Sequence, residues 1–356
     1  MKFADVLEIK NGRNQRQVEN PDGRYPIYGS GGVMGRADDY ICEAETVVIG
    51  RKGSINNPIF VNEPFWNVDT AFGLIAKRDV LLPKYLYYFC VNFDFEKLNT
   101  TVTIPSLTKA NLLQIEIALP TLEEQKKVVD VLDKVTNLVE LRQQQLAKLD
   151  ELVKARFVEM FGDPVSNSLQ LPEKKLAELG EFGRGVSKHR PRNDPALLGG
   201  KYPLIQTGEV ASADVYITSY QNSYSELGFQ QSKLWKKGTL CITIAANIAK
   251  TAILGFDACF PDSVVGFNAN EKTNEIFIHY WFSFFQAILE AQAPESAQKN
   301  INLKILGDLK VIVPDISAQT EFVSFVIQIE KTKLSIQRSL EQIETLKKAL
   351  MQQYFG

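Results

Sequence analysis

The sequence has few of the residues from which metal centres and nucleophilic sites are usually built. Its 356 residues include 2 histidines and 4 cysteines. His189 and His279 are far apart in the chain, and no group of histidine, cysteine and carboxylate residues has the spacing of a metal site. The cysteines are scattered and form no C-x-x-C motif, so we expect buried thiols rather than disulfides or metal ligands. This usage predicts a protein of the reducing cytoplasm.

Long apolar runs and an excess of one charge are also missing. No stretch is long enough to span a membrane, and no secretory signal follows Met1. The formal net charge of −2 excludes a generic polycation, so binding to nucleic acid would have to come from local patches. The densest basic stretch runs from Arg184 to Arg192 without an acidic residue, and it is equally compatible with a solvated loop. The length predicts two to three domains.

No catalytic motif is complete. The glycine-rich residues 29–35 do not match G-x-G-x-x-G, and residues 50–54 lack the G-K-[ST] of a P-loop. Asn57-Pro58-Ile59-Phe60 approaches the Asn/Asp-Pro-Pro-aromatic motif of adenine methyltransferases, but Ile59 replaces the second proline. We therefore expect no catalytic residue in this chain.

What the sequence does contain is a long internal repeat. One constant offset without a gap aligns residues 120–162 with residues 314–356. The identical pairs include Pro120 and Pro314, Gln125 and Gln319, Leu152 and Leu346, and Gly162 and Gly356. A repeat of this kind indicates that the fold contains two copies of the same structural unit.

Each copy has the pattern of one long amphipathic helix, over 121–161 and 315–355. Apolar residues recur at spacings of three, four and seven, and Thr121 with Glu124 fits a capping box. A helix of about 40 residues is about 60 Å long, and its apolar stripe needs a partner. We expect the two helices to pair as an antiparallel coiled coil. The buried seam is expected to include Val135, Leu146, Leu149, Ile329, Ile336 and Ile343. A core helix in an ordinary globular domain is the alternative.

The segments before the two helices also resemble one another, with the same order of elements. Short β-branched runs at 45–49 and 238–244 predict strands, and so do residues 71–76 and 264–267. Aromatic-rich helices are expected at 83–98 and 275–291, followed by strands at 115–120 and 309–314. The predicted fold is therefore α+β, with a pseudo-two-fold repeat. Its predicted segments are a globular domain at 1–120, a helix at 121–162, a second globular domain at 163–314 and a second helix at 315–356.

Polar, glycine-bearing loops lie at matching positions of the two globular segments. Their side chains are the donors that contact base edges and phosphates, and their glycines let a backbone approach a phosphate closely. Ordinary turns have the same composition. The candidate DNA-binding residues are Tyr28, Ser30, Gly31, Arg51, Lys52, Ser54, Trp66, Asn67 and Thr70 in the first segment, and Lys188, Arg190, Gln206, Thr207, Asn247, Lys250 and Ser263 in the second. The loop at residues 51–54 of the first segment corresponds loosely to residues 247–250 of the second.

Three motifs resemble the specificity (S) subunits of type I restriction–modification systems. They are Pro120-Thr121-Leu122-Glu123-Glu124-Gln125 at a helix start, Tyr25 to Gly32 with Ile49 to Ser54 downstream, and Cys259 to Phe267. The resemblance covers essentially the whole chain as two target-recognition domains alternating with two spacer helices. The second helix start, Pro314 to Gln319, departs from the pattern because it lacks both acidic residues.

The resemblance implies a DNA-recognition subunit without a catalytic site. Each recognition domain would bind one half of a split double-stranded DNA target, and the helices would set the distance between the halves. Modification subunits would dock on the helices, bind S-adenosylmethionine and methylate adenine. Restriction subunits would supply ATP- and Mg-dependent translocation and cleavage. Two alternatives stay open at this point: the recognition portion of a fused adenine methyltransferase, and a coiled-coil adaptor that binds only protein.

Overall fold

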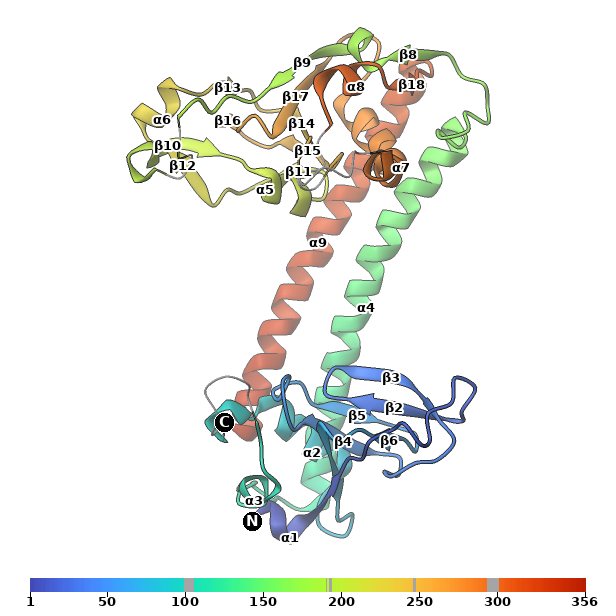
Figure 1. Ribbon diagram of the computed structural model, residues 1–356, viewed down its shortest axis with the longest axis vertical. Coiled ribbons are helices and arrows are strands. Elements are labelled where there is room, and N and C mark those ends of the chain that lie inside the picture. Colours follow the sequence, from blue (N-terminus) through green and yellow to red (C-terminus); the bar gives the residue numbers. More distant parts are fainter. Residues whose placement is uncertain (99–105, 190, 192–193, 246–247, 293–300) are drawn as a thin grey trace. The chain divides into compact units, whose positions relative to one another are not determined.

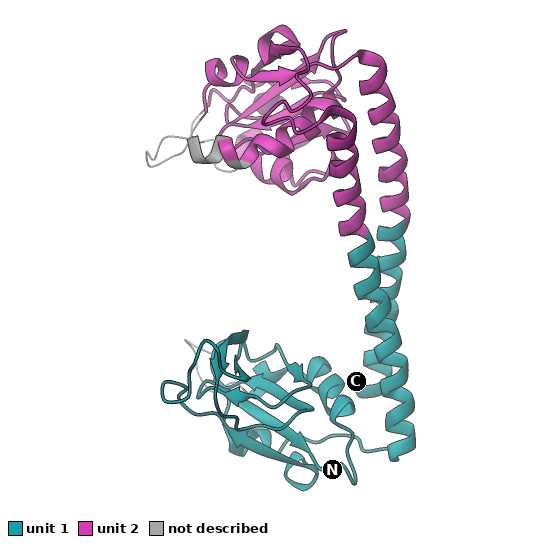
Figure 2. Ribbon diagram, turned by 90° about the vertical axis from the view of Figure 1, so that its right-hand side faces the viewer, with its two compact units in different colours: residues 1–145, 336–356 teal, residues 146–335 magenta. Residues whose placement is uncertain are grey.

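The chain forms two compact units, each containing parts of both long helices. The computed structural model describes residues 1–98, 106–189, 191, 194–245, 248–292 and 301–356. Unit 1 comprises residues 1–145 and 336–356, and unit 2 comprises residues 146–335 (Figure 2). Because the boundary cuts both long helices, each unit combines one sheet domain with the adjoining parts of both helices.

The two long helices begin and end within one residue of the predicted limits. They are α4 (Leu122–Phe161) and α9 (Ile316–Phe355) (Figure 1). At the start of α4, the Thr121 backbone N–H donates to the Glu124 carboxylate, and the Glu124 N–H donates to the Thr121 hydroxyl, which is the predicted capping box. Gly162 ends α4 with a φ of 71°, a conformation that favours glycine.

The helices pair antiparallel, as predicted. In unit 1 the early residues Val129 and Leu132 of α4 share a core with Met351 near the end of α9. In unit 2 the late residue Phe157 of α4 packs against Phe322 near the start of α9, with ring centroids 5.3 Å apart. An ion pair between Arg156 and Glu321, 2.8 Å long, joins the same two stretches.

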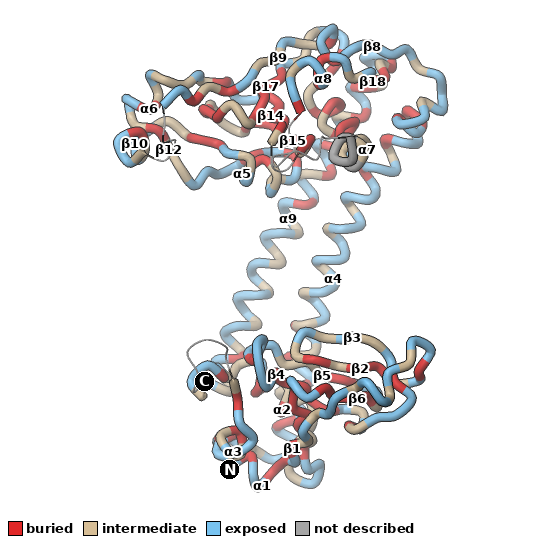
Figure 3. Tube along the Cα trace, in the orientation of Figure 1, coloured by how far each residue is buried: buried red, intermediate tan, exposed pale blue. Residues whose placement is uncertain are grey.

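The central seam is less buried than predicted. Val135 and Ile329 are buried, but Leu146, Leu149, Ile336 and Ile343 are only half-buried (Figure 3). Ile329 belongs to the core of unit 2 and Leu149 packs at its edge, whereas Leu146, Ile336 and Ile343 belong to neither core and have the partner helix as their main cover.

Unit 1 is built on two small sheets. The four-stranded antiparallel sheet has the order β1-β7-β4-β5, and in the sheet β3-β2-β6 the strands β2 and β6 are parallel. Helix α2 packs on the larger sheet. The elements are α1 (Phe3–Val6), β1 (Leu7–Asn11), β2 (Tyr25–Gly29), β3 (Gly32–Ala37), β4 (Thr46–Gly50), β5 (Ile59–Val61), β6 (Trp66–Asn67), β7 (Ala71–Ala76), α2 (Pro83–Asn92), η1 (Phe95–Leu98) and α3 (Lys109–Leu112).

Unit 2 repeats this plan with additions. Its larger sheet has the order β11-β15-β14-β17-β9, its second sheet β12-β10-β16-β13, and β18 pairs with β8. The strands are β8 (Glu173–Lys175), β9 (Gly180–Arg184), β10 (Leu198–Leu204), β11 (Tyr216–Ile217), β12 (Asn222–Tyr224), β13 (Leu234–Trp235), β14 (Leu240–Thr243), β15 (Thr251–Leu254), β16 (Ala258–Cys259), β17 (Val264–Ala269) and β18 (Lys310–Ile312). The helices are η2 (Leu176–Glu178), η3 (Pro195–Leu197), α5 (Thr207–Ser212), α6 (Glu226–Gln230), α7 (Glu275–Gln292) and α8 (Leu303–Gly307).

One predicted strand is wrong. Residues 309–314 contain β18, but residues 115–120 form only an isolated bridge between Lys2 and Glu116. Strand β18 pairs with β8 over three residues, whereas in unit 1 regular pairing is limited to that one residue pair. A single bridge is too short to make a ladder.

A buried glutamine joins each long helix to its sheet domain. The side chain of Gln125 is fully buried; its amide nitrogen donates to the carbonyls of Val80 and Pro120, and its oxygen accepts from the Leu82 N–H, all at 2.9 Å. All of these partners are main-chain groups just before α2 and α4. The amide therefore holds the start of α4 to the start of α2.

Gln319, the repeat partner, does the same in unit 2. Its amide nitrogen donates to the carbonyls of Lys272 and Pro314 at 3.1 and 2.9 Å, and its oxygen accepts from the Thr273 hydroxyl at 3.0 Å. It too is fully buried. The same connection is thus made before α7 and α9.

Polar ties of a different kind connect the helices to each domain. In unit 1, Asp133 of α4 accepts hydrogen bonds from Lys84 and Tyr88 of α2, both at 2.6 Å. In unit 2, Lys333 of α9 is 4% exposed and lies 2.7 Å from Asp150 and 2.6 Å from Asp214. Burial lowers the pKa of Lys333, but its hydrogen bonds to both carboxylates outweigh this and hold it above the usual value.

The predicted state of the cysteines is confirmed. All four are free and buried, and burial raises the pKa of the Cys42 thiol to about 12. Within the described ranges, no three or more His, Cys, Asp and Glu side chains gather where a metal ion could bind. No helix in the described part of the chain has the length and apolar character needed to cross a membrane.

Replacing Gln125 with Leu should test the buried amide. Leu has similar bulk but leaves two carbonyls and one N–H without partners, so we expect the free energy of unfolding to fall by about 2–4 kcal/mol. The matched control is Gln143→Leu at an exposed position of α4, which should change it by no more than about 0.5 kcal/mol. Chemical denaturation measures both. Equal effects from the two variants would contradict the role assigned to Gln125.

Candidate nucleic-acid interface

Three predicted segments of unit 1 meet at one corner of its sheets. The carbonyl of Thr70 accepts hydrogen bonds from the N–H groups of Arg51 and Lys52, at 2.8 and 3.3 Å. A Cβ placed on Gly50 would lie 3.0 Å from the Cβ of Ser30, so the β2–β3 turn adjoins the turn after β4. The fold therefore brings together residues that the sequence places up to 40 positions apart.

The side chains at this corner are available to a ligand. Gly31, Arg51, Lys52, Ser54 and Thr70 are exposed. The guanidinium of Arg51 lies 5.8 Å from the centre of the Phe72 ring, and no carboxylate of the described residues forms an ion pair with it. An exposed cation without an internal counter-ion can bind phosphate or a base edge.

The other half-buried candidates form the edge of the corner. Ser30 is half-buried, and the half-buried ring of Tyr28 packs edge-on against Phe65 with centroids 5.3 Å apart. Burial and the nearby Glu63 raise the pKa of Tyr28, so its hydroxyl stays neutral and can donate.

Two predicted contacts in unit 1 are corrected. Trp66 is 7% exposed, and its indole N–H donates to the Arg13 carbonyl at 3.0 Å. Asn67 is fully buried, and its amide donates to the Ala71 carbonyl at 3.1 Å. Both side chains are used inside the fold, so we remove them from the candidate contact set.

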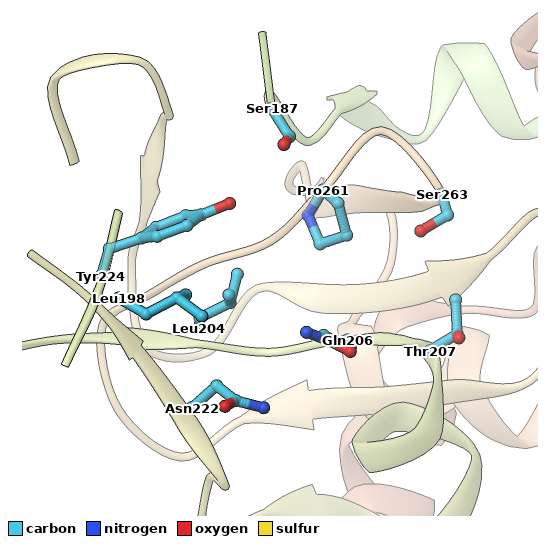
Figure 4. A pocket seen from close by; sticks show the side chains of 9 residues that line it. All are labelled: Ser187, Leu198, Leu204, Gln206, Thr207, Asn222, Tyr224, Pro261 and Ser263. Atoms are coloured by element: carbon cyan, nitrogen blue, oxygen red, sulfur yellow. The ribbon is translucent and has the colours of Figure 1, made fainter. Parts of the chain in front are cut away.

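In unit 2 the equivalent corner is a pocket of about 390 Å³ (Figure 4). It brings together the predicted residues Gln206, in the loop after β10, Thr207, the first residue of α5, and Ser263, in the loop after β16. The remaining lining residues are Ser187, Leu198, Leu204, Asn222, Tyr224 and Pro261.

The pocket has an apolar wall and neutral polar groups at its rim. None of the nine lining side chains is charged. In Figure 4, Leu198 and Leu204 lie between the ring of Tyr224 and the amides of Gln206 and Asn222. Within the described residues, neither of these amides is used in a hydrogen bond to another side chain or to the backbone, so both can bind a ligand. Amides of this kind offer one donor and one acceptor to the edge of a base.

The strand registers show which residues of the two corners are equivalent. Gly50 pairs with Ala71 in unit 1, and Thr243 pairs with Val264 in unit 2. One residue further on, the Ile244 N–H donates to the Ser263 carbonyl at 3.0 Å, as Arg51 does to Thr70. The position of Arg51 is therefore taken in unit 2 by Ile244, which is buried, and not by residues 247–250 as matched from the sequence.

The remaining predicted residues of unit 2 do not join this pocket. Lys188 is exposed on the loop after β9, and Arg190 and Asn247 lie outside the described residues. Lys250 is half-buried and lines a separate cavity of about 290 Å³ between the sheet and the helices, together with His279 and Lys333. Burial lowers the pKa of His279 to about 4, so this histidine is neutral, and Lys333 is already paired with the carboxylates of Asp150, Asp214 and Glu330. We therefore separate Lys250 from the pocket residues.

Sequence reasoning missed Ser187, Asn222 and Tyr224. Asn222 and Tyr224 belong to β12, which pairs antiparallel with β10 as β3 pairs with β2 in unit 1. However, β12 follows β10 through a connection that includes α5 and β11, where unit 1 has only a short turn, so the spacing in the two segments differs. The repeat therefore gave no signal for them. Ser187 lies within the basic stretch that begins at Arg184, and a single serine among basic residues has no sequence signal of its own.

Two curated relatives span most of this chain. A protein of Haemophilus influenzae described as a type I restriction enzyme specificity subunit is 25% identical over 89% of this chain and 83% of its own length. The specificity subunit of the type I restriction enzyme EcoBI of Escherichia coli is 21% identical over 94% of this chain and 77% of its own length. These proteins are named as separate subunits, which gives no support to a fused methyltransferase or a protein-only adaptor.

Two solved structures share the fold over the whole chain. The S subunit of a type I restriction–modification system from M. genitalium matches with a TM-score of 0.65 and 16% identity, covering 100% of this chain and 95% of its own. A chain from a study of complex assembly and conformational transition in a type I system matches with a TM-score of 0.59, 16% identity, and coverage of 100% and 96%. The model of the type I restriction modification DNA specificity domain matches residues 1–151 and 172–345, and the chain therefore belongs to that family.

Proposed function

We propose that this chain is the DNA-recognition subunit of a type I restriction–modification complex and that each unit binds one half of a split target. The observation that carries the proposal is that both units have the same corner between their sheets. The backbone hydrogen bonds of the two corners are equivalent, but their side chains differ. A protein that reads two different half-sites needs a constant framework and variable contact residues. Membership of the DNA specificity domain family supports the same function.

The two corners differ in the chemistry that they offer to DNA. Unit 1 presents the exposed cations Arg51 and Lys52 beside Ser30 and Thr70. Unit 2 presents neutral amides and hydroxyls around an apolar wall. Arginine binds guanine edges and phosphates, whereas Gln and Asn amides match adenine. We therefore infer that unit 1 contributes more of the salt-dependent affinity and that unit 2 depends more on neutral hydrogen bonds.

The long helices are proposed to be both spacer and docking platform. Each is continuous over 40 residues, which corresponds to about 60 Å. Their outer faces carry exposed apolar side chains, including Leu138, Leu141 and Leu334. Surfaces of this kind suit protein partners, and the modification subunits are the partners that the family suggests.

Catalysis is proposed to belong to the partners. In this division of labour the modification subunits bind S-adenosylmethionine and methylate adenine, and a restriction subunit uses ATP and Mg. The incomplete Asn57-Pro58-Ile59-Phe60 motif supports this assignment, because the residue that should follow the first proline is Ile59.

The division of labour can be tested directly. The purified chain should not methylate DNA in the presence of S-adenosylmethionine, and addition of the modification subunit should yield methylation of one split sequence. Methylation mapping and a gel shift at low and moderate salt measure the two properties. Methylation by the chain alone, or no sequence-specific binding with the partner present, would overturn the proposal.

Arg51→Ala should affect one half-site only. If the guanidinium contacts a guanine edge, the change should cost about 1–3 kcal/mol of binding and relax preference at one base. If it contacts phosphate, binding should weaken evenly and the salt slope should fall by about one. Arg78→Ala, which removes another exposed arginine of unit 1 that pairs with Glu45, is the matched control and should leave both unchanged. Altered preference in both half-sites would contradict separate recognition.

Shortening both helices should change the spacing of the target and not the bases read. Deleting residues 138–144 and 337–343 removes one heptad from each helix and keeps the apolar seam in phase. The loss of about 10 Å corresponds to about three base pairs. Methylation mapping of the reconstituted complex should find the same half-sites with a shorter gap. New half-sites at the old separation would contradict the spacer role.

A further inference from the structure

Two exposed apolar side chains lie near the start of β3, directly after the turn of the β2–β3 hairpin of unit 1, and we refer to this end of the hairpin as its tip. Val33 and Met34 are 61% and 62% exposed, and of the large apolar residues that the structure describes only Met1 is more exposed. Exposed apolar pairs at a loop tip are costly in water and commonly mark a binding surface. The function proposed above does not use them.

A β-bulge at Met34 places the two exposed side chains next to each other in β3. Ile27 pairs with Gly35, but the next pair is Tyr28 with Val33, so Met34 is an extra residue without a partner in the ladder. In a regular strand, neighbouring side chains point to opposite faces, whereas here both are exposed. Met34 lies across Gly29, where a Cβ would come 2.5 Å from its sulfur. The hairpin therefore presents one small apolar tip.

The tip is continuous with the cationic corner. Ser30, in the turn of the same hairpin, adjoins Gly50, and Arg51 follows Gly50 directly. Arg51 and Lys52 of this corner are exposed. The guanidinium of Arg36, at the other end of the hairpin, donates to the Gly23 and Arg24 carbonyls, and the Glu19 carboxylate lies beside Gly35. A ligand that covers both the tip and this corner therefore meets an apolar surface beside two exposed cations, and an anionic polymer with apolar interior faces has both properties.

We propose that Val33 and Met34 form a wedge that enters the base stack of the DNA at one step of the half-site bound by unit 1. Apolar wedges of this kind unstack a base step and bend the duplex. Arg51 and Lys52 hold the adjoining backbone while the tip enters, and the glycines of the turn allow close approach. Because the wedge acts on the DNA bound by the same corner, this inference depends on the proposed function.

The stack around the wedge can be followed with 2-aminopurine, whose fluorescence rises when it is unstacked. The complex with the modification subunit is bound to its mapped target, with 2-aminopurine placed in turn at each adenine of the unit 1 half-site and its flanks. The wild-type complex should raise the fluorescence several-fold at one step. Met34→Gln keeps the length of the side chain but not its apolar character, and it should abolish most of that rise.

Affinity on altered duplexes provides a second readout. The double variant Val33→Ser, Met34→Gln should bind the intact target about tenfold more weakly. On a duplex with an abasic gap at the responsive step, where unstacking is already complete, the difference should shrink to about twofold. Met34→Leu retains an apolar tip and should behave as wild type on both duplexes. Val91→Gln, which removes a 42% exposed apolar side chain from α2, is the matched control.

The outcomes separate the wedge from its alternatives. A wild-type complex that binds its target without any rise in fluorescence, or a Met34→Gln complex that keeps the rise, would overturn the wedge and leave the proposed function intact. If Met34→Gln prevents assembly with the modification subunit in the absence of DNA, the tip is a protein contact and the proposal is wrong. A wild-type complex that binds no specific duplex would overturn the proposed function itself.

Discussion

A buried side-chain amide at the beginning of each long helix is the constraint on which the architecture depends. Gln125 and Gln319 lie at repeat-related positions, and each bonds to main-chain groups on both sides of a junction. A buried amide without these partners would be costly, so the geometry of the junction is tightly specified. Because all of these bonds except the one from the Thr273 hydroxyl to Gln319 are to main-chain groups, most side chains around the junction can change without breaking them. This explains how one helix start serves two sheet domains of different sequence.

The same backbone plan then supports different chemistry. The hydrogen bond from Arg51 to Thr70 and the one from Ile244 to Ser263 are equivalent in register, yet one position offers a cation and the other a buried apolar side chain. In unit 2 the strand β12, which occupies the place of β3, supplies Asn222 and Tyr224 to the lining of a pocket. Because the backbone hydrogen bonds between the strands are the same in both units, the side chains at the two surfaces can differ without a change of fold.

The sequence predicted the repeated elements well because their signals are periodic. The apolar stripe located α4 and α9 to within one residue. The weaker repeat between the two globular segments is also present in the structure: Tyr25 and Tyr202 lie in equivalent strands, and the Thr70 and Ser263 carbonyls accept equivalent hydrogen bonds. The sequence did not predict correctly which polar side chains are exposed and therefore available to a ligand. Trp66 and Asn67 have the composition of a contact loop, but the fold uses their polar groups internally. No local pattern distinguishes these cases, since exposure depends on the strands that pack above them.

The seam also illustrates this limit, because heptad spacing identifies the face and not the depth of burial. Leu146, Leu149, Ile336 and Ile343 occupy seam positions and remain half-exposed. The degree of burial depends on how many neighbouring elements reach the helices. Val129, Leu132, Phe322 and Val326 are buried where the cores of the sheet domains reach the helices, whereas Leu146, Ile336 and Ile343 lie outside those cores.

The apolar outer face of the helix pair has a consequence for handling the protein. Leu138, Leu141 and Leu334 are 45%, 53% and 50% exposed, and the charge of −2 is small for a chain of this length. Weak electrostatic repulsion and exposed leucines together favour self-association in dilute buffer. We expect the isolated chain to be colloidally unstable at high concentration and to become well behaved once another protein covers those leucines. Co-expression with that protein would then be the practical route to homogeneous material.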